Sequence, residues 1–210
     1  MLSSERVSEI EAAPWFYRAD SPYLIVDTDL RVRAVNTAYE VATDHPRSLL
    51  VGERLFDVFP DNPADPLADG VSRLSASLES VFSAGERRWM GVLRHDVPDL
   101  WQPGRFRHKV WAPVNSPIHQ DGRTVGAVHH AEDVTAVVDP ARRGVPWARL
   151  EESARALGCR FPELAHETVV GTLAQSLRVV MAAAGGADTE RAEALATVRL
   201  ELLAGHPALG

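Results

Sequence analysis

The sequence predicts an α+β fold that is followed by an all-α region. Two observations carry this prediction. Short segments with the apolar runs and polar/apolar alternation of strands lie on both sides of one amphipathic helical pattern between residues 23 and 134. From residue 147 onward, apolar residues recur at helical spacing only. With 210 residues, 45% of them hydrophobic and 24% charged, the chain fits one modest globular core with an appendage.

The first segments predict a helix and then a hairpin. Residues 1–19 predict a short helical extension that lays Trp15 and Phe16 on the domain that follows. Residues 23–27 form an apolar run, and residues 31–35 alternate polar with apolar side chains. Because turn-forming residues separate the two segments, they predict an antiparallel hairpin with one solvated face.

The next segments predict helices of very different length. Asn36 suits a helix start, because its side-chain oxygen can accept a free backbone N–H of the first turn. Prolines punctuate residues 46–66 and leave room only for short turns. Residues 69–84 then predict one helix that ends at Gly85. Its apolar face consists of Val71, Leu74, Leu78, Val81 and Phe82.

Three more strands are predicted before residue 135. They span residues 88–95, 105–114 and 124–134. Asp121 and Gly122 lie between the last two strands, and Asp-Gly is a strong hairpin turn. The last two strands are therefore expected to pair directly.

The order of three segments resembles a PAS sensory domain over residues 20–138. The segments are LIVD at 24–27, NTAY at 36–39 and EDVT at 132–135. Residues 111–117 also look like the penultimate strand of PAS domains in bacterial signalling proteins. The resemblance implies a five-stranded antiparallel sheet flanked by helices, and a protein that binds a ligand or partner and relays a change of state.

Candidate site residues follow from this resemblance and from the aromatic content of the strands. The ligand-pocket candidates are Trp89, Trp111, His129, Leu74 and Leu78. Large aromatic residues on a sheet also serve as core, so both interpretations of the tryptophans stay open. Asp133 and Thr135 are candidates for the relay that couples the sheet to an output segment, with a simple polar turn at a strand end as the alternative.

The C-terminal part predicts a linker and three helices. Prolines and glycine punctuate residues 139–146, and they interrupt any continuous helix across this linker. Residues 147–205 follow with three apolar helical patterns. The third pattern is capped by Asp188 or Thr189 and consists of Ala192, Leu195, Val198 and Leu202.

The same region carries a second resemblance. The motifs RFPE at 160–163 and ETV at 167–169 resemble the three-helix bundle dimerisation domains of actinobacterial proteins. A homodimer is expected, because a domain of about 60 residues buries only about 60% of its unfolded surface. Pairing with a second copy would cover part of the remainder.

Histidines and the single cysteine bear on cofactors. His129 and His130 are consecutive in a strand and point to opposite faces, and His108 lies roughly 20 Å from His129 along the hairpin. These side chains cannot share one metal ion, so no metal is expected. Haem is not expected. Haem-binding PAS domains usually carry the axial histidine on the long helix, and the predicted helix has no histidine between Val71 and Phe82. Flavin chemistry of the LOV type is excluded, because Cys159 lies in the wrong domain. The cofactor stays unknown.

Charge and composition exclude several functional classes. Net charge is −7, with 29 acidic and 22 basic residues, and this balance disfavours nucleic-acid binding. No apolar run approaches the roughly 20 residues that cross a bilayer. Glu5 and Glu9 stand where a secretory signal is basic and then apolar, so a cytoplasmic protein without membrane contact is expected.

The sequence thus predicts a sensory or regulatory protein that passes its output to another protein. It contains no glycine-rich phosphate loop and no supported catalytic triad, so it is not expected to be an enzyme. One alternative is an interaction scaffold with a filled core. A second is a small-molecule enzyme, which a pKa-shifted His129 or His130 beside a carboxylate would indicate.

Overall fold

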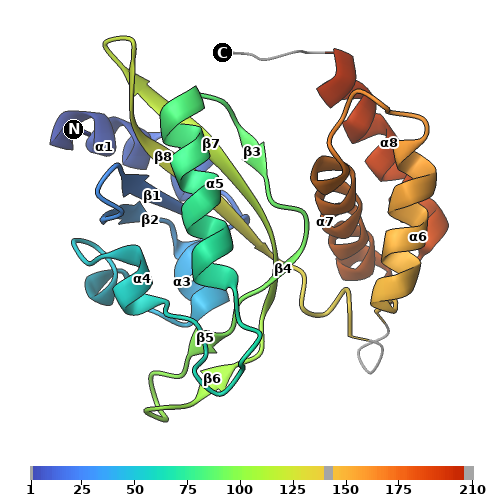
Figure 1. Cartoon of the computed structure of the whole chain (residues 1–210), viewed down its shortest axis with the longest axis horizontal. Helices are drawn as coiled ribbons and strands as arrows, with labels where there is room; N and C mark the ends of the chain where they lie inside the picture. The colour runs from blue at the N-terminus through green and yellow to red at the C-terminus, as the bar shows by residue number, and fades with distance from the viewer. Residues whose placement is uncertain (1, 140–143, 206–210) are drawn as a thin grey trace. The chain divides into compact units, whose positions relative to one another are not determined.

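The structure is a computed structural model that describes residues 2–139 and 144–205 (Figure 1). It divides into two compact units. The first unit consists of Met1–Arg88, Arg94–Lys109 and Val114–Glu132, and the second of Trp89–Leu93, Val110–Pro113 and Asp133–Gly210. Among the described residues, no helix is long and apolar enough to cross a membrane.

The main sheet confirms the predicted fold class. Its strands run in the order β2-β1-β8-β7-β3, with β4 also paired to β7. They are β1 (Tyr23–Asp27), β2 (Val32–Val35), β3 (Arg88–Trp89), β4 (Leu93–Arg94), β7 (Val110–Gln120) and β8 (Arg123–Asp133). Strand β1 is antiparallel to β2 and to β8. The result is a PAS-like antiparallel sheet with flanking helices.

Two predicted strands differ in detail. The strand predicted over 88–95 is split into β3 and β4, because Gly91 adopts a left-handed backbone with φ of +68°. The sheet therefore has six strands where five were expected. The strand predicted over 105–114 is also interrupted. Its first part is β6 (Phe106–Arg107), which pairs with β5 (Val97–Pro98) in a small second sheet.

The β7–β8 hairpin has the predicted turn. β7 ends at Gln120 and β8 begins at Arg123. The two residues between them, Asp121 and Gly122, have φ values of +52° and +72°. Positive φ at both positions is what a two-residue type I′ turn requires, and Asp-Gly adopts it readily. This turn sets the register of the two longest strands.

Helices in the first unit follow the predicted order. They are α1 (Ser4–Ala12), α2 (Pro14–Tyr17), α3 (Thr37–Thr43), the 3-10 helix η1 (Arg47–Leu49), α4 (Leu55–Val58) and α5 (Gly70–Ala84). Helix α5 lies across the sheet (Figure 1) and buries Leu74, Leu78 and Val81. It ends at Gly85, whose φ of +67° confirms the predicted glycine stop.

Asn36 caps α3 as predicted and also joins the N-terminal segment to the sheet. Its side-chain oxygen accepts the N–H of Tyr39 at 3.0 Å and the N–H of Tyr23 at 2.9 Å. Its amide nitrogen donates to the carbonyl oxygens of Phe16 and Ser21. All four hydrogen-bonding positions of the buried carboxamide are therefore used.

The N-terminal helices pack as predicted, except for one aromatic side chain. Phe16 is buried, whereas Trp15 stays 49% exposed. The apolar residues of this segment share a core with the sheet, formed by Leu2, Val7, Ile10, Phe16, Ile25, Ala34, Ile118 and Val125. The N-terminal segment is therefore part of the folded first unit.

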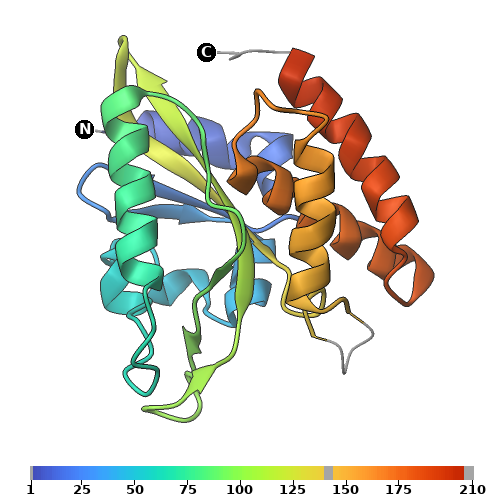
Figure 2. The same ribbon diagram turned by 45° about the vertical axis from the view of Figure 1, so that its right-hand side comes forward.

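The second unit contains the three C-terminal helices. They are α6 (Trp147–Gly158), α7 (His166–Ala184) and α8 (Thr189–Gly205), which lie side by side (Figures 1 and 2). Within this unit the helices share one core with Val110, Ala112, Val134 and Val137. Of the predicted linker, residues 140–143 lie outside the described residues.

The ends of α7 and α8 follow local rules. Helix α7 stops at Gly185, which adopts a left-handed backbone with φ of +71°. The predicted cap of α8 is confirmed, since the Asp188 side chain accepts the N–H of Arg191 at 3.1 Å. Both ends depend only on residues within one turn of the helix.

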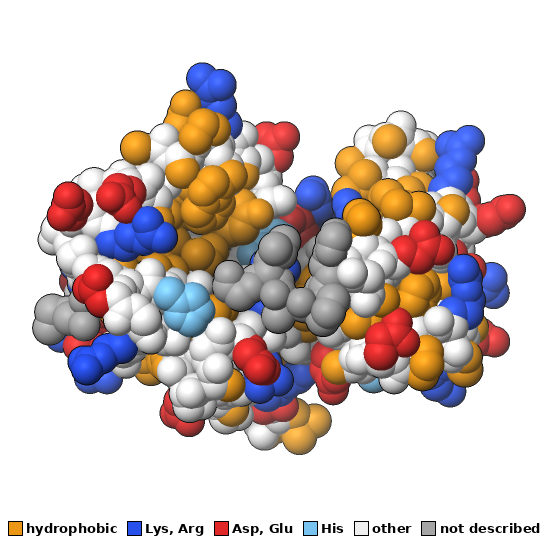
Figure 3. Space-filling view, turned by 90° about the horizontal axis from the view of Figure 1, so that it is seen from above, with side chains coloured by type: hydrophobic (Ala, Val, Ile, Leu, Met, Phe, Trp, Pro, Cys, Tyr) orange, Lys and Arg blue, Asp and Glu red, His pale blue; other side chains and the backbone are white. Residues whose placement is uncertain are grey.

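The predicted apolar face of α8 is wrong for two of its four residues. Val198 and Leu202 are 54% and 60% exposed, and the buried residues are Ala192, Ala196 and Leu200. Small residues at a contact let helices approach closely, because the distance between helix axes depends on the side chains between them. Leucine and valine are more hydrophobic than alanine, so the sequence pattern predicted the wrong face of α8 as the buried one. Figure 3 shows hydrophobic side chains at the surface of the C-terminal helices, beside acidic and basic ones.

Candidate functional site

The five predicted pocket residues fall into two groups. Leu74, Leu78 and His129 belong to the first unit and are buried. Trp89 and Trp111 belong to the second unit. The structure therefore places three of the five on α5 and β8 of one unit, and the two tryptophans in other surroundings.

The two tryptophans have different surroundings. Trp89 lies beside α7, where a Cβ added to Gly171 would come within 3.2 Å of its ring. Trp111 is buried between Val110 and Ala112 in the sequence of β7. Because those two neighbours belong to the core of the C-terminal helices, strand alternation directs the Trp111 ring to the opposite face of β7.

A series of hydrogen-bonded polar side chains, of which His129 and Asn115 are buried, joins β8, β7 and α5. His129 Nδ1 lies 2.7 Å from Asn115 Oδ1, and Asn115 Nδ2 donates to Ser77 Oγ at 2.8 Å. Because a carboxamide oxygen only accepts, the imidazole carries its hydrogen on Nδ1. His129 was predicted from the sequence as a site residue, whereas Asn115 and Ser77 were not. For Asn115, the available signal was its position as a polar residue directly after the predicted strand end at residue 114.

Burial keeps the ionisable side chains of His129 and Tyr39 neutral. Burial, together with smaller contributions from the nearby His130 and His95, lowers the pKa of His129 to about 3. The Tyr39 ring lies 6.5 Å from the His129 ring, and burial raises the pKa of its phenol. The hydrogen-bond partner of His129 is an amide, which is neutral.

His130 points away from His129, as the strand alternation predicts. Its Nε2 lies 2.9 Å from the Glu132 carboxylate, and its ring lies 4.9 Å from the ring of Tyr23. Tyr23 packs in turn against the N-terminal residues Trp15 and Phe16. The two faces of β8 therefore carry different chemistry: a neutral polar chain toward α5 and an aromatic cluster toward the N-terminal helices.

The two relay candidates bond to each other and to β7. Asp133 Oδ1 accepts the backbone N–H of Thr135 at 3.0 Å and its hydroxyl at 2.6 Å. The Thr135 hydroxyl oxygen accepts the N–H of Val110 at 2.9 Å, and Val110 O accepts the N–H of Val134. Val110 and Val134 also contribute to the core of the C-terminal helices. Both the relay and the polar turn fit this geometry.

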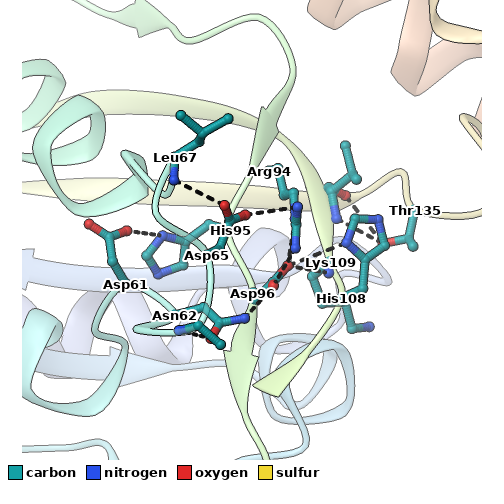
Figure 4. Close-up of polar contacts among 12 residues, drawn as sticks. Asp61, Asn62, Asp65, Leu67, Arg94, His95, Asp96, His108, Lys109 and Thr135 are labelled. Atoms are coloured by element: carbon teal, nitrogen blue, oxygen red, sulfur yellow. Dashed lines mark hydrogen bonds and ion pairs between the residues drawn. The ribbon is translucent and has the colours of Figure 1, made fainter. Parts of the chain in front are cut away.

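A second polar cluster lies around Asp96 (Figure 4). The buried Asp96 carboxylate accepts two hydrogen bonds from Arg94, at 3.0 and 2.8 Å, and one from Asn62 at 2.9 Å. Burial by itself raises the pKa of Asp96, but these hydrogen bonds outweigh burial and hold that pKa below its ordinary value. Arg94 also pairs with Asp65 at 2.8 Å. The cluster therefore fastens the segment before α5 to β4.

His95 lies at the start of α5 beside this cluster. Its Nε2–H donates to Phe59 O at 3.2 Å, its Nδ1 lies 3.6 Å from Asp61, and burial lowers its pKa. The neighbouring cavity of about 50 Å³ is lined by Asp61, Asn62, Asp65, Leu67, Ala68, Asp69, Arg94, His95 and Asp96. Across the described ranges, no three histidine, cysteine, aspartate or glutamate side chains are placed to hold a metal ion. We interpret the cluster as structural.

Comparison with known families decides the classification. A family profile described as the PAS fold matches residues 17–139, which is more than half of the chain. The chain belongs to the PAS fold family. No curated protein matches the sequence.

Solved PAS structures resemble the chain at low sequence identity. The LOV protein of Rhodobacter sphaeroides is 12% identical, with 97% of both chains covered and a TM-score of 0.49. A PAS domain from Colwellia psychrerythraea is 14% identical over 60% of this chain and 95% of its own, with a TM-score of 0.46. The PAS domain of nitrogen regulation protein NR(II) from Vibrio parahaemolyticus is 14% identical over 57% and 94%, with a TM-score of 0.41.

In this PAS domain the candidate functional site is the region around His129, Asn115 and Ser77. It presents neutral hydrogen-bonding groups in a unit whose α5 face buries Leu74 and Leu78. These three side chains carry hydrogen-bonding groups but no charge that could balance an ionic group.

Proposed function

We propose that this PAS protein binds a small ligand or a protein partner and passes the change of state to its C-terminal helices, which dimerise. The observation that carries the proposal is the His129–Asn115–Ser77 chain. These two hydrogen bonds connect β8 to β7 and β7 to α5. A ligand group that replaces one of them would therefore shift the three elements relative to one another.

The output route follows the ends of β7 and β8. Thr135 bonds the first residue of β7, Val110, and Val110 packs in the core of the C-terminal helices. Gln175 of α7 donates to Ala112 O in the same strand at 3.2 Å. A displacement of this part of β7 would therefore move α7 directly. We expect the protein to pass its output to another protein. We also expect it to be located in the cytoplasm and to assemble as a homodimer.

Exposed apolar side chains on α8 support the dimer. Val198 and Leu202 are four positions apart, so they lie on one face of the helix, and both are more than half exposed. Val198→Glu is expected to weaken dimerisation about tenfold, because it would place a carboxylate in an apolar contact. Val41→Glu, at a 76% exposed position of α3, is the matched control. Light scattering across a concentration series measures both, and equal affinities would remove α8 from the dimer surface.

Native mass spectrometry together with an absorbance spectrum tests the function itself. Protein purified under mild conditions is expected to appear as a dimer that carries extra mass, and the spectrum then identifies the chromophore class of that mass. A Soret band would bring haem back. A monomer without extra mass at micromolar concentration would contradict both the ligand and the dimer.

A scaffold with a filled interior is the second candidate, and one observation favours it. Leu78, Tyr39 and His129 are at most 5% exposed, and His129 already has a hydrogen-bond partner inside the protein. On this alternative the same experiment gives a dimer of bare chains. Binding of a partner protein would then leave the interior unchanged.

A further inference from the structure

The strand at the β3–β4 edge of the main sheet contains one extra residue. Met90 N–H donates to Pro113 O, and His95 N–H donates to Lys109 O. Between these two hydrogen bonds the edge strand takes five steps along the chain, whereas the strand opposite takes four. Gly91 lies in this interval and has a left-handed backbone. The interruption between β3 and β4 is therefore a β-bulge, in which one extra residue bends a strand out of its regular pairing.

The bulged residues belong with the C-terminal helices. Trp89–Leu93, which we call the edge bulge, is part of the second unit, whereas the residues on both sides of it are part of the first. Val92 packs against the core of the C-terminal helices. Because a bulge changes the direction of side chains, the extra residue accounts for this departure from the rest of the edge strand.

One face of α7 lies against the edge bulge. A Cβ added to Gly171 would come within 3.2 Å of the Trp89 ring and 3.5 Å of Gly91 O. A Cβ added to Gly91 would lie 3.5 Å from Glu167 Cα. Gln175 donates to a carbonyl oxygen of β7 at 3.2 Å. Glu167, Gly171 and Gln175 follow one another at intervals of four positions, so they share this face of the helix.

Two glycines permit the close approach of strand and helix. Glycine stabilises the interior of a helix less than alanine does, so the buried Gly171 has its reason in packing. A contact of 3.2 Å is shorter than ordinary van der Waals contact, and the Trp89 ring would have to move to admit a methyl group. Gly91 supplies both the left-handed backbone and the small surface on the strand side.

The edge strand is also in contact with both ends of α5. Before the bulge, Arg88 Nε donates to Ser80 Oγ of α5 at 2.9 Å. After the bulge, the His95 ring fills the space beside Gly70, the first residue of α5, where a Cβ would overlap it (Figure 4). Arg88 directly precedes the edge bulge, and His95 follows it by two residues. A movement of α5 therefore acts on the chain at both sides of the bulge.

We propose that the edge bulge couples α5 to α7, so that a displacement of α5 draws residues 89–93 away from Gly171 and loosens α7. The two states are a docked bulge, as in this structure, and a withdrawn one. The inference deepens the proposed function and rests on it, because a ligand near His129 would act on α5 through Ser77. The edge bulge is then a second route to α7, besides Asp133 and Thr135.

Gly171→Ala tests the contact from the side of α7. Hydrogen exchange of the full chain, followed by mass spectrometry, is expected to be about threefold faster or more in residues 89–93, because the added methyl group displaces Trp89. Gly158→Ala in α6 is the matched control, since a Cβ there meets nothing within 4 Å, and it is expected to leave this exchange unchanged. Unchanged exchange in Gly171→Ala as well would overturn the docking of the bulge on α7.

Gly70→Ala tests the coupling from the side of α5. It displaces His95, and exchange in residues 167–175 of α7 is expected to rise about threefold or more relative to exchange in β1. An equal rise in β1 would show general destabilisation and would count against the coupling. Ser80→Ala is a milder second variant that removes the hydrogen bond to Arg88, with Ser83→Ala as its control because Ser83 bonds only within α5.

These outcomes are separate from those of the proposed function. If α7 exchanges at the wild-type rate in both α5 variants, the coupling is overturned, although native mass spectrometry can still show a dimer that retains a ligand. If the α5 variants speed exchange in α7 but native mass spectrometry shows a monomer without extra mass, the coupling stands as a property of the fold and the proposed ligand and dimer fail.

Discussion

His129 donates its Nδ1–H to the side-chain oxygen of Asn115 across the two longest strands, over 2.7 Å. Both side chains are buried, at 5% and 0% exposure, so water cannot readily replace either partner. A buried donor that loses its acceptor retains the full cost of its desolvation. The loss of stability is therefore expected to differ between a variant that removes one partner of this hydrogen bond and a variant that removes both.

Asn115→Ala is expected to lower the free energy of unfolding by about 1–3 kcal/mol, because it leaves the His129 N–H unsatisfied. Urea denaturation followed by circular dichroism measures the change. The double variant Asn115→Leu with His129→Leu removes both polar partners and is expected to be less destabilised than the sum of the two single leucine variants. Simple additivity would show that the hydrogen bond contributes nothing to stability.

Acid is expected to destabilise the protein through His129. Its pKa is about 3 when folded and about 6.5 when unfolded, so between these values the unfolded chain binds a proton that the folded chain does not. Stability is therefore fully present above pH 6.5 and falls by up to about 1.4 kcal/mol per pH unit below it. The measurement is the urea midpoint from pH 7 to pH 5, above the range where Asp96 titrates.

The His129→Leu variant is the control for this pH dependence. It is expected to show a shallower slope, with a remainder from His95, whose pKa is also lowered by burial. Equal slopes in the wild type and the variant would mean that His129 titrates normally in the folded protein.

Gly70→Ala is expected to destabilise the protein by about 1–3 kcal/mol. A Cβ at residue 70 would overlap the His95 ring, which is held by its hydrogen bond to Phe59 O. Gly158→Ala at the end of α6 is the matched control, because a Cβ there meets nothing within 4 Å. That change is expected to be neutral or to stabilise by up to about 1 kcal/mol. Equal melting temperatures of the two variants would contradict the close approach of His95.

Local physics explains why several elements were predictable from sequence. The α5 spacing, the Asn36 cap and the Asp121–Gly122 turn each depend on residues within a few positions of one another. The structure confirms all three. A capping side chain or a positive φ is a property of the local chain, so no knowledge of distant contacts was needed.

Contacts between distant segments explain what the sequence analysis missed. Trp89 packs beside Gly171, which is more than 80 positions away, and no periodicity reports such a contact. The core face of α8 was partly misassigned, because Ala196 is buried where helices approach closely. Ser77 lies on α5 outside its apolar stripe, and only the fold places it against Asn115.

Asp133→Ala tests the relay at the end of β8. The carboxylate accepts both hydrogen bonds from Thr135, so its removal is expected to free the Thr135 hydroxyl and loosen the contact with Val110. Hydrogen exchange is expected to rise in residues 110–113 and 133–138 while β1 and β2 stay protected, because opening is confined to the contacts that were weakened.

The dimer dissociation constant separates the relay from a polar turn. If the relay operates, this constant changes in Asp133→Ala although the first unit melts normally, because the loosened contact belongs to the core of the C-terminal helices. Thr135→Ser keeps the hydroxyl and is the control, expected to dimerise like the wild type. Unchanged dimerisation in Asp133→Ala would leave this motif as a polar turn, because its hydrogen bonds would then stabilise only the strand end that they join.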